Sequence, residues 1–246
     1  MEGYDIFVPE MKLDSKYSVS GAECQVLSVA LKPGENVQSE PGAMMMMSPS
    51  IKTDVGCGAA TRVCTGESCC VTTYENNGRE DGFVSLTPNF PAKIVPLHLP
   101  SVNNTFVAKN GSFMSSIGSA EVNADCDANP ITCCLGGLGM CRQKVSGDGT
   151  VFYTAGGTVL QKNLAAGEKV IVDAQSIVGF QESVTFGVTP TGACCSCCFA
   201  GEGLCYGTLE GPGLVMVQSM SFEKYLNAVA PAYGGEANSA AADSAN

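Results

Sequence analysis

Cysteine is the residue of this chain with the most scope for chemistry, because 14 thiols are present and several stand close together. Four thiolates at suitable spacing could hold zinc or an iron–sulfur cluster. Adjacent cysteines suit a single metal ion poorly, however, since neighbouring side chains diverge on an extended backbone. The ligand candidates for such a site are Cys133, Cys134, Cys141, Cys194, Cys195, Cys197, Cys198 and Cys205.

Three interpretations of these thiols stay open from the sequence. We favour the first, in which they fill apolar space in loops, because a free cysteine is most often a small buried hydrophobic residue. Metal ligation is the second, and reactive thiols for lipidation or redox chemistry are the third. We therefore predict a protein without a metal or cofactor, and keep zinc or iron–sulfur binding as the alternative.

The residues that most often serve in catalysis do not form a set. His98 is the only histidine, so a histidine-based triad or multi-histidine metal site would lack its other members. Glu35 and Glu168 could act as the paired acids of a glycosidase, but each follows a turn glycine, which favours a role in turns. We predict no catalytic residue, and thus a protein that is not an enzyme.

The run Met44–Met47 offers thioethers to a soft metal. Alternate residues of a strand face opposite sides, so only every second methionine could face one site. Methionine is a flexible apolar filler, and we expect this run to pack in the core or in an interface.

Charge and composition exclude further classes. The chain has 13 basic and 24 acidic residues, and its net charge of −11 repels phosphate backbones, which argues against nucleic acid. We find no signal peptide, no arginine-rich transit peptide and no apolar run long enough for a transmembrane segment. We expect a cytoplasmic or peripherally attached protein with reduced cysteines.

Comparison of the chain with itself indicates three copies of one strand-rich unit. Residues of the first copy recur at one constant interval in the third: Leu31, Gly34, Glu35, Val37 and Glu40 match Leu164, Gly167, Glu168, Val170 and Asp173. A fainter middle copy aligns Phe106 with Val37. Cysteines also recur, each followed eight residues later by a glycine: Cys70, Cys141 and Cys205 precede Gly78, Gly149 and Gly213. We predict that each of these glycines closes a hairpin at positive φ.

These signals predict one all-β domain at 1–233, with repeats at about 17–90, 91–156 and 157–226, and a disordered tail at 234–246. Strands are expected at Val26–Ala30, Phe83–Leu86, Lys93–Leu97, Thr105–Ala108 and Lys169–Val172. One short helix is expected at Phe222–Val229, capped by Ser221. The repeat register also predicts that the cysteine-bearing loops gather at one end.

Several segments, in this order, resemble the altered-inheritance-of-mitochondria 24 family. They are LKPGENVQSEPGAMMMMS, TGESCCVTTY, FPAKIVPLHL, GTVFYTAGGTVLQKNLAAGEKVIVD and GEGLCYGTLEGPGLVMVQSM. The resemblance implies a TRAP-like double-stranded β-helix, a β-prism of three pseudo-repeats with a short C-terminal helix, and it suggests mitochondrial association. The chain departs from the family where its glycine-rich loops carry cysteines. Fold alone transfers no activity.

Together these observations predict a structural or interaction scaffold whose loop-rich end meets a membrane surface or a protein partner. Exposed edges between repeats would also suit a symmetric homo-oligomer. The rival functions are metal binding through the loop cysteines and, third, small-molecule binding inside the β-helix.

Overall fold

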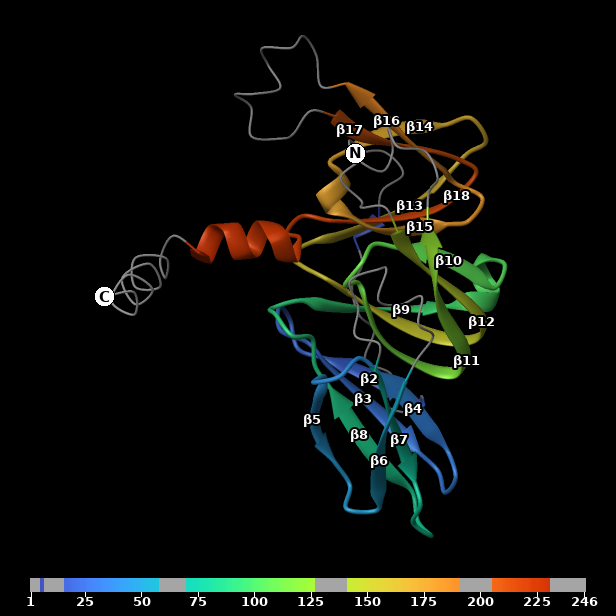
Figure 1. Cartoon of the computed structure of the whole chain (residues 1–246), viewed down its shortest axis with the longest axis vertical. Coiled ribbons are helices and arrows are strands. Elements are labelled where there is room, and N and C mark those ends of the chain that lie inside the picture. Colours follow the sequence, from blue (N-terminus) through green and yellow to red (C-terminus); the bar gives the residue numbers. More distant parts are fainter. Residues whose placement is uncertain (1–4, 7–15, 58–69, 127–140, 191–204, 231–246) are drawn as a thin grey trace, which may run out of the picture.

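The computed structural model describes residues 5–6, 16–57, 70–126, 141–190 and 205–230, which form antiparallel strands with short helical segments (Figure 1). The strands are β1 (Asp5–Ile6), β2 (Tyr17–Ser20), β3 (Val26–Leu31), β4 (Asn36–Ser39), β5 (Met44–Met47), β6 (Ile51–Cys57), β7 (Cys70–Asn76), β8 (Gly82–Leu86), β9 (Lys93–His98), β10 (Thr105–Ala108), β11 (Phe113–Cys126), β12 (Cys141–Ala155), β13 (Val159–Leu164), β14 (Lys169–Val172), β15 (Ile177–Gln181), β16 (Thr185–Pro190), β17 (Cys205–Glu210) and β18 (Gly213–Gln218). Two 3-10 turns, η2 (Leu99–Val102) and η3 (Ala174–Ser176), and a helix at residues 222–230 complete the described chain. The prediction of an all-β protein with one short helix is confirmed, whereas the tail expected at 234–246 lies outside the described residues.

The strand pairings fall into three groups that we call sets. Set 1 comprises β3 to β8, set 2 comprises β9 to β12, and set 3 comprises β13 to β18. In set 1, β8 pairs with β3 and β5, while β7 pairs with β4 and β6. In set 3, β18 pairs with β13 and β15, while β17 pairs with β14 and β16. Set 2 makes the same pairings with fewer strands, because the two halves of β11 and of β12 each take the place of one short strand.

The predicted hairpins at the recurring glycines are wrong. The strands that these glycines join, β7 with β8 and β17 with β18, do not pair with each other but enter different ladders. The chain instead turns a corner from one sheet to another, a place where glycine is common. Two such corners lie side by side in set 1 and again in set 3. In set 1 the corner between β3 and β4 contacts the end of β7, where the Gly34 N–H donates to Asn76 O at 2.8 Å. In set 3 the corner between β13 and β14 contacts the one between β17 and β18, where the Gly167 N–H donates to Gly211 O at 3.3 Å. Within the described residues, adjacent strands pair as hairpins in β2–β3, β6–β7, β11–β12 and β16–β17.

The three predicted turn glycines also differ in conformation. Only Gly213 has a positive φ, at 143°, while Gly78 and Gly149 do not. Gly149 lies within the continuous strand β12, and so closes no turn. In set 1 the counterpart of Gly213 is Gly82, because Gly82 pairs with Leu31 as Gly213 pairs with Leu164. The connection from β7 to β8 is longer than that from β17 to β18, so the glycine equivalent to Gly213 is Gly82 rather than Gly78.

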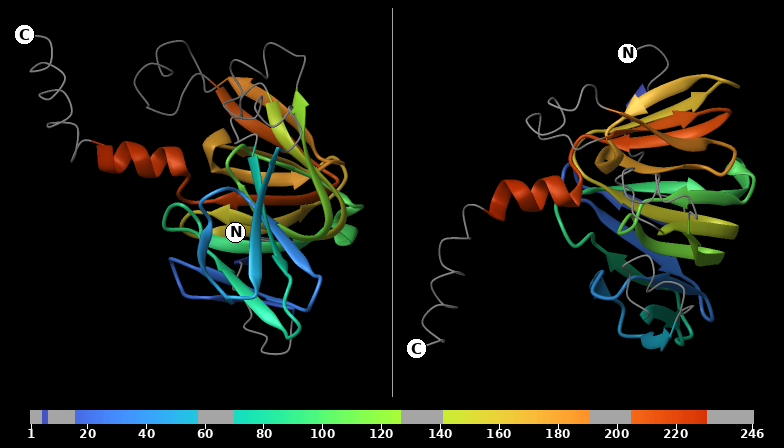
Figure 2. Two further views of the ribbon diagram at one scale, coloured as in Figure 1. Left: turned by 60° about the horizontal axis from the view of Figure 1, so that its bottom comes forward. Right: turned by 45° about the horizontal axis from the view of Figure 1, so that its top comes forward.

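The three sets follow one another along the long axis of the molecule, as Figures 1 and 2 show. Set 1 lies at one end, set 2 in the middle and set 3 at the other end. Each set has a buried apolar cluster, and each cluster takes a few residues from a neighbouring set. Phe152 of set 2, for example, is fully buried in the cluster of set 1. Neighbouring sets therefore share buried clusters.

The C-terminal helix at residues 222–230 projects from the side of this body (Figure 1). The predicted cap is confirmed, because the Ser221 hydroxyl accepts a hydrogen bond from the Lys224 N–H at 3.2 Å. The ammonium of Lys109 pairs with Glu223 on this helix, which holds it against set 2. None of the helices in the described part of the chain has the length and apolar character that a membrane span needs.

Candidate functional site

The predicted metal ligands fall mainly outside the described residues. Cys133, Cys134, Cys194, Cys195, Cys197 and Cys198 all lie there. The other two, Cys141 and Cys205, open β12 and β17, at the places in their ladders that Cys70 holds in β7. Among the residues that the structure describes, no three histidine, cysteine or acidic side chains gather as a metal site would require. The prediction that the loops share one end stays a prediction.

One cysteine corrects the expectation of reduced thiols. Cys126, the last residue of β11, is disulfide-bonded. The ladder of β11 and β12 continues to its last residue pair, in which Cys126 lies directly opposite Cys141. Strand ends held this close bring cysteine backbones within the range of a disulfide. By contrast, Cys24 is exposed and reduced.

Glu35 and Glu168 have equivalent roles in two turns. The Glu35 carboxylate accepts a hydrogen bond from the Lys32 N–H at 3.0 Å, and Glu168 accepts one from the Ala165 N–H at 2.9 Å. The hydrogen bond from the Lys32 backbone, followed by that from the Lys16 side chain, holds the pKa of Glu35 below its usual value. Each carboxylate is thus engaged within its own turn, as the sequence suggested.

His98 ends β9 and is exposed. Its Nδ1 lies 3.5 Å from the Thr150 hydroxyl on the neighbouring strand β12, and this cross-strand contact is the role that the structure gives it.

Most of the methionine run lies outside the core of this chain, and only Met47 is partly buried against the core cluster of set 1. Met44–Met47 form β5, and the first three side chains are exposed by 42%, 47% and 48%. The strands of sets 2 and 3 that take the same place are the first half of β11 and β15, and both are buried. Core packing is therefore wrong for Met44, Met45 and Met46, because no described strand covers the outer side of β5, whereas packing in an interface stays a prediction.

At the other end of the molecule, β14 shows the same contrast. Ile171 is exposed by 64%, although Val107, which takes its place in β10, is buried. Val107 lies opposite Phe180 of β15, whereas β14 pairs only with β17 among the described strands; Gln38, which takes the same place in β4, is exposed although β4 pairs with β11. Thus β5 and β14 each lack a neighbour that their counterparts have.

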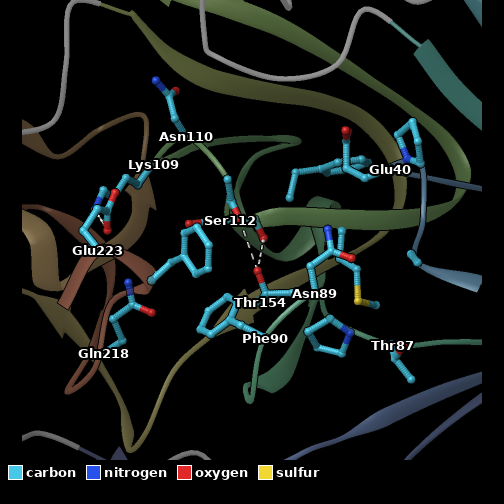
Figure 3. A pocket seen from close by; sticks show the side chains of 17 residues that line it. Glu40, Thr87, Asn89, Phe90, Lys109, Asn110, Ser112, Thr154, Gln218 and Glu223 are labelled. Carbon is cyan, nitrogen blue, oxygen red and sulfur yellow. Dashed lines mark hydrogen bonds and ion pairs between the residues drawn. The ribbon is translucent and has the colours of Figure 1, made fainter. Parts of the chain in front are cut away.

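A pocket of about 360 Å³ opens between sets 1 and 2, beside the C-terminal helix (Figure 3). It is lined by Glu40, Pro41, Ala43, Thr87, Pro88, Asn89, Phe90, Lys109, Asn110, Gly111, Ser112, Phe113, Met114, Thr154, Gln218, Phe222 and Glu223. In Figure 3, Lys109 and Glu223 lie together on one side, and Glu40 lies on the opposite side.

Hydrogen bonds fix the polar groups of this pocket. The Lys109 ammonium lies 2.9 Å from a carboxylate oxygen of Glu223, and the Thr154 hydroxyl donates to the carbonyls of Gly111 and Ser112. Burial acts to raise the pKa of Glu223, but the hydrogen bond from Lys109, the backbone N–H of Glu223, the charge of Lys109 and the Ser221 hydroxyl together outweigh it, so the pKa lies below the usual value. A paired cation and a bonded hydroxyl suit binding better than nucleophilic chemistry.

Sequence reasoning missed both the pocket and the open edges. The pocket combines turns, a strand and a helix from across the chain, and no local pattern joins them. The edges did leave a signal, because aligning Met44–Met47 with the middle copy sets four methionines against Phe113–Ser116, which contains two serines. A strand that is more apolar than its counterparts, at the end of a repeat series, indicates a surface that a partner covers.

Comparison with known proteins finds two similar proteins of Streptococcus pyogenes. An uncharacterized protein of serotype M6 is 26% identical over 162 residues, which make up 65% of this chain and 62% of the relative. The match therefore spans less than two thirds of that relative's length. A solved crystal structure of a protein from this organism has a TM-score of 0.68 at 20% identity, and covers 87% of this chain and 97% of its own. This second likeness shows that the fold is shared.

A family model described as Mitochondrial biogenesis AIM24 matches residues 17–220, which include every strand from β2 to β18. This range contains all three sets and the turns of Glu35 and Glu168. The resemblance seen in the sequence is confirmed: the chain belongs to the Mitochondrial biogenesis AIM24 family.

Proposed function

We propose that this protein is a non-catalytic scaffold that binds other polypeptides along the open edges of β5 and β14. One observation carries the proposal: apolar positions of β5 are exposed although the same positions of β11 and β15 are buried, and Ile171 of β14 is exposed although Val107 of β10 is buried. Met45 is 47% exposed, while Met114 and Val178, at the same place in β11 and β15, are 3% and 0% exposed. An apolar strand with unpaired N–H and C=O groups is a template for another strand.

The frame of this scaffold, in our proposal, is a TRAP-like double-stranded β-helix made of three repeats. The recurring ladders of sets 1, 2 and 3 support it. So does the alignment of Val37, Phe106 and Val170, which pair with residues placed alike in β7, β12 and β17. A scaffold of this kind presents a rigid edge, and sheet addition needs such an edge.

Other features of the described residues suit a binding role. Glu35 and Glu168 are engaged in turns, and His98 contacts only a threonine hydroxyl across its ladder among the contacts described. The metal alternative has no support from the described residues, since its candidate ligands lie almost wholly outside them. Binding at the edges therefore remains the function that the geometry supports best.

Hydrogen exchange tests this function. Backbone amides would be followed in the purified full chain, first in dilute buffer and then after incubation in an extract of its own cells. We expect exchange in the extract to slow in β5 and β14, because strand addition protects edge amides. Protection confined to other strands, or protection nowhere, would overturn the proposal.

Substitutions sharpen this experiment. Ile171→Lys and Met46→Lys each place a charge on one edge strand and should abolish protection at that strand. Val55→Lys is the matched control, because Val55 is a 60% exposed apolar residue on β6 whose counterparts take part in no contact between sets. The control should retain protection at both edges.

A further inference from the structure

The strand that would pair with each open edge is indicated by two strand pairings already present within the chain, β4 with β11 and β10 with β15. We propose that β14 of one molecule pairs with β5 of a second copy, so that the molecules associate head to tail. This inference rests on the proposed function, since it names the partner of the same two edges. Its basis is the contact between neighbouring sets.

Neighbouring sets meet through one kind of strand pairing, which we call the junction. At the first junction β4 pairs with β11, with Ser39 opposite Ser115. At the second, β10 pairs with β15, with Ala108 opposite Gly179. Ser39 and Ala108 hold the same place in their sets. Ser39 pairs with Thr72 of β7 and Ala108 pairs with Gln143 of β12, and each of these partners lies two residues after the cysteine that begins its strand.

A third junction would join the remaining copies of the same two strands. The counterpart of β4 and β10 is β14, and the counterpart of the first half of β11 and of β15 is β5. The shared register predicts Val172 opposite Met46, and Ile171 opposite Met47, across two molecules. Within one molecule β14 and β5 cannot meet, because they lie at opposite ends of the long axis (Figures 1 and 2).

The sheets give the same answer. Two small sheets stand apart from the large one: a 4-stranded sheet β2-β3-β8-β5 and a 3-stranded sheet β14-β17-β16. The large sheet contains the run β1-β13-β18-β15-β10-β12-β11. Its first four strands, β1-β13-β18-β15, correspond to the 4-stranded sheet, and its last three, β10-β12-β11, correspond to the 3-stranded sheet. In the large sheet the two parts are joined by the pairing of β15 with β10. The two small sheets are thus the halves of a sheet that the chain completes elsewhere, and a second copy would complete it.

Backbone hydrogen bonds beside the junctions repeat as well. The Glu40 N–H donates to Met114 O, and the Lys109 N–H donates to Val178 O, both at 2.9 Å. Asp173 follows β14 as Glu40 follows β4, and Met45 takes the place of Met114. The third bond would run from the Asp173 N–H to Met45 O of the neighbouring copy. The β-bulge at this place in β5, β11 and β15 occurs in all three strands, so it does not prevent pairing.

Side-chain sizes at the junction also suit this pairing. At the second junction a Cβ on Gly179 would lie 2.4 Å from the Phe106 ring, so a large residue on β10 requires a small one on β15. On the open edges the sizes are reversed. The place of Phe106 is taken by Val170, and the place of Gly179 by Met46. The first junction has the same combination as the open edges, because Val37 takes the place of Phe106 and Ser115, which has a side chain, takes the place of Gly179.

The two edges differ from each other, so the interface between copies is heterologous rather than isologous. Such contacts build rings when the rotation closes and filaments when it does not. They also allow a decisive mixing experiment, because each molecule has one edge of each kind and the edges can be blocked separately.

The test uses the purified full chain, measured by sedimentation velocity and light scattering over a concentration series. The wild type is expected to form species larger than a monomer. Ile171→Lys blocks β14 and Met46→Lys blocks β5, and each should weaken self-association about 100-fold or more, since it places a charge in the strand contact between two apolar edges. An equimolar mixture of the two variants should form a dimer and nothing larger, because it has one good β14 and one good β5.

One control variant and the mixed variants together show which outcomes support or contradict this pairing. Val55→Lys should associate like the wild type, and circular dichroism and melting temperature should show that all variants fold. In the mixed dimer, slowed amide exchange is expected in β14 of the Met46→Lys chain and in β5 of the Ile171→Lys chain. Persistence of a dimer in either variant alone would show like-with-like pairing, and a mixture that stays monomeric would exclude pairing of β14 with β5.

The failure of this inference can be distinguished from that of the proposed function. A wild type that is monomeric at every concentration overturns pairing between copies. If β5 and β14 of that monomer are nevertheless protected in the cell extract, the edges bind a different polypeptide and the proposed function stands. If neither experiment gives protection, both proposals fail.

Discussion

The ammonium of Lys109 lies 2.9 Å from a carboxylate oxygen of Glu223 and joins the turn before β11 to the C-terminal helix. The Lys109 side chain is only 8% exposed, whereas that of Glu223 is 48% exposed. Removing the carboxylate would leave a nearly buried cation without its counterion. We expect Glu223→Ala to lower the free energy of unfolding by about 1–2 kcal/mol, measured by urea denaturation.

Two further variants identify the cause. Lys109→Met combined with Glu223→Ala should recover most of the loss, because an apolar pair leaves no charge buried. Glu182→Ala breaks the more exposed pair with Lys144 and should cost about 0.5 kcal/mol or less. Equal losses in the two single glutamate variants would contradict the role of burial.

Acid should weaken the turn that Glu35 closes. The hydrogen bond from the Lys32 N–H and then that from the Lys16 side chain lower the pKa of Glu35 below 4.5. A lowered folded-state pKa gives stability that is present above the unfolded-state value and is lost as pH falls through the folded-state value. The wild type should therefore melt at a higher temperature than Glu35→Gln at pH 7, and the two melting curves should converge below about pH 4.

The matched control is Glu121→Gln, which changes an exposed glutamate of β11. Its melting temperature should follow that of the wild type throughout the pH series. A constant difference between wild type and Glu35→Gln from pH 7 to pH 3 would show that the charge of Glu35 is not the cause.

Crowding at the second junction makes Gly179 hard to replace. A Cβ at this residue would lie 2.4 Å from the Phe106 ring and 2.7 Å from Val107 O. We expect Gly179→Ala to cost about 1–3 kcal/mol in unfolding free energy, as overpacking does. Gly56→Ala on β6 is the control, because no heavy atom lies within 4 Å of its added Cβ. If the two variants unfold at the same urea concentration, the close approach of Phe106 is not present in solution.

The fully buried Tyr153 hydroxyl offers a stabilising substitution. Its oxygen has no hydrogen-bond partner among the described residues, and burial raises the pKa of the phenol well above its usual value. Tyr153→Phe removes a desolvated polar group and keeps the ring that packs against Phe106. Its unfolding free energy should equal or exceed that of the wild type by up to about 1 kcal/mol, and a loss above that amount would reveal a bond to the hydroxyl.

Local sequence patterns predicted individual strands well, because strand formation depends on short alternating runs between turns. Thr105–Ala108 and Lys169–Val172 are strands with the predicted bounds, and the helix begins where Ser221 caps it. Pairing could not be predicted in this way. A glycine-containing turn looks the same in sequence whether the chain folds back on its own strand or crosses to another sheet.

The binding edges were harder to find for a related reason. The sequence shows that Met44–Met47 is apolar, but burial depends on whether a neighbouring strand is present. Sets 1 and 2 each supply a strand to the junction between them, and only the structure shows that no such neighbour covers β5 or β14 within the described residues. Cys126 shows the same limit, since the sequence does not indicate which of the cysteines are disulfide-bonded.

The corner-turning connections also bear on how fast the chain reaches its fold. Because β3 pairs with β8 and β13 with β18, most ladders join strands separated by several others, and closing such loops is entropically costly. Among the described strands, only the hairpins β2–β3, β6–β7, β11–β12 and β16–β17 join strands that are adjacent in the sequence. Folding on the scale of milliseconds to seconds is therefore expected, with these four hairpins forming first and the edges of β5 and β14 exposed throughout.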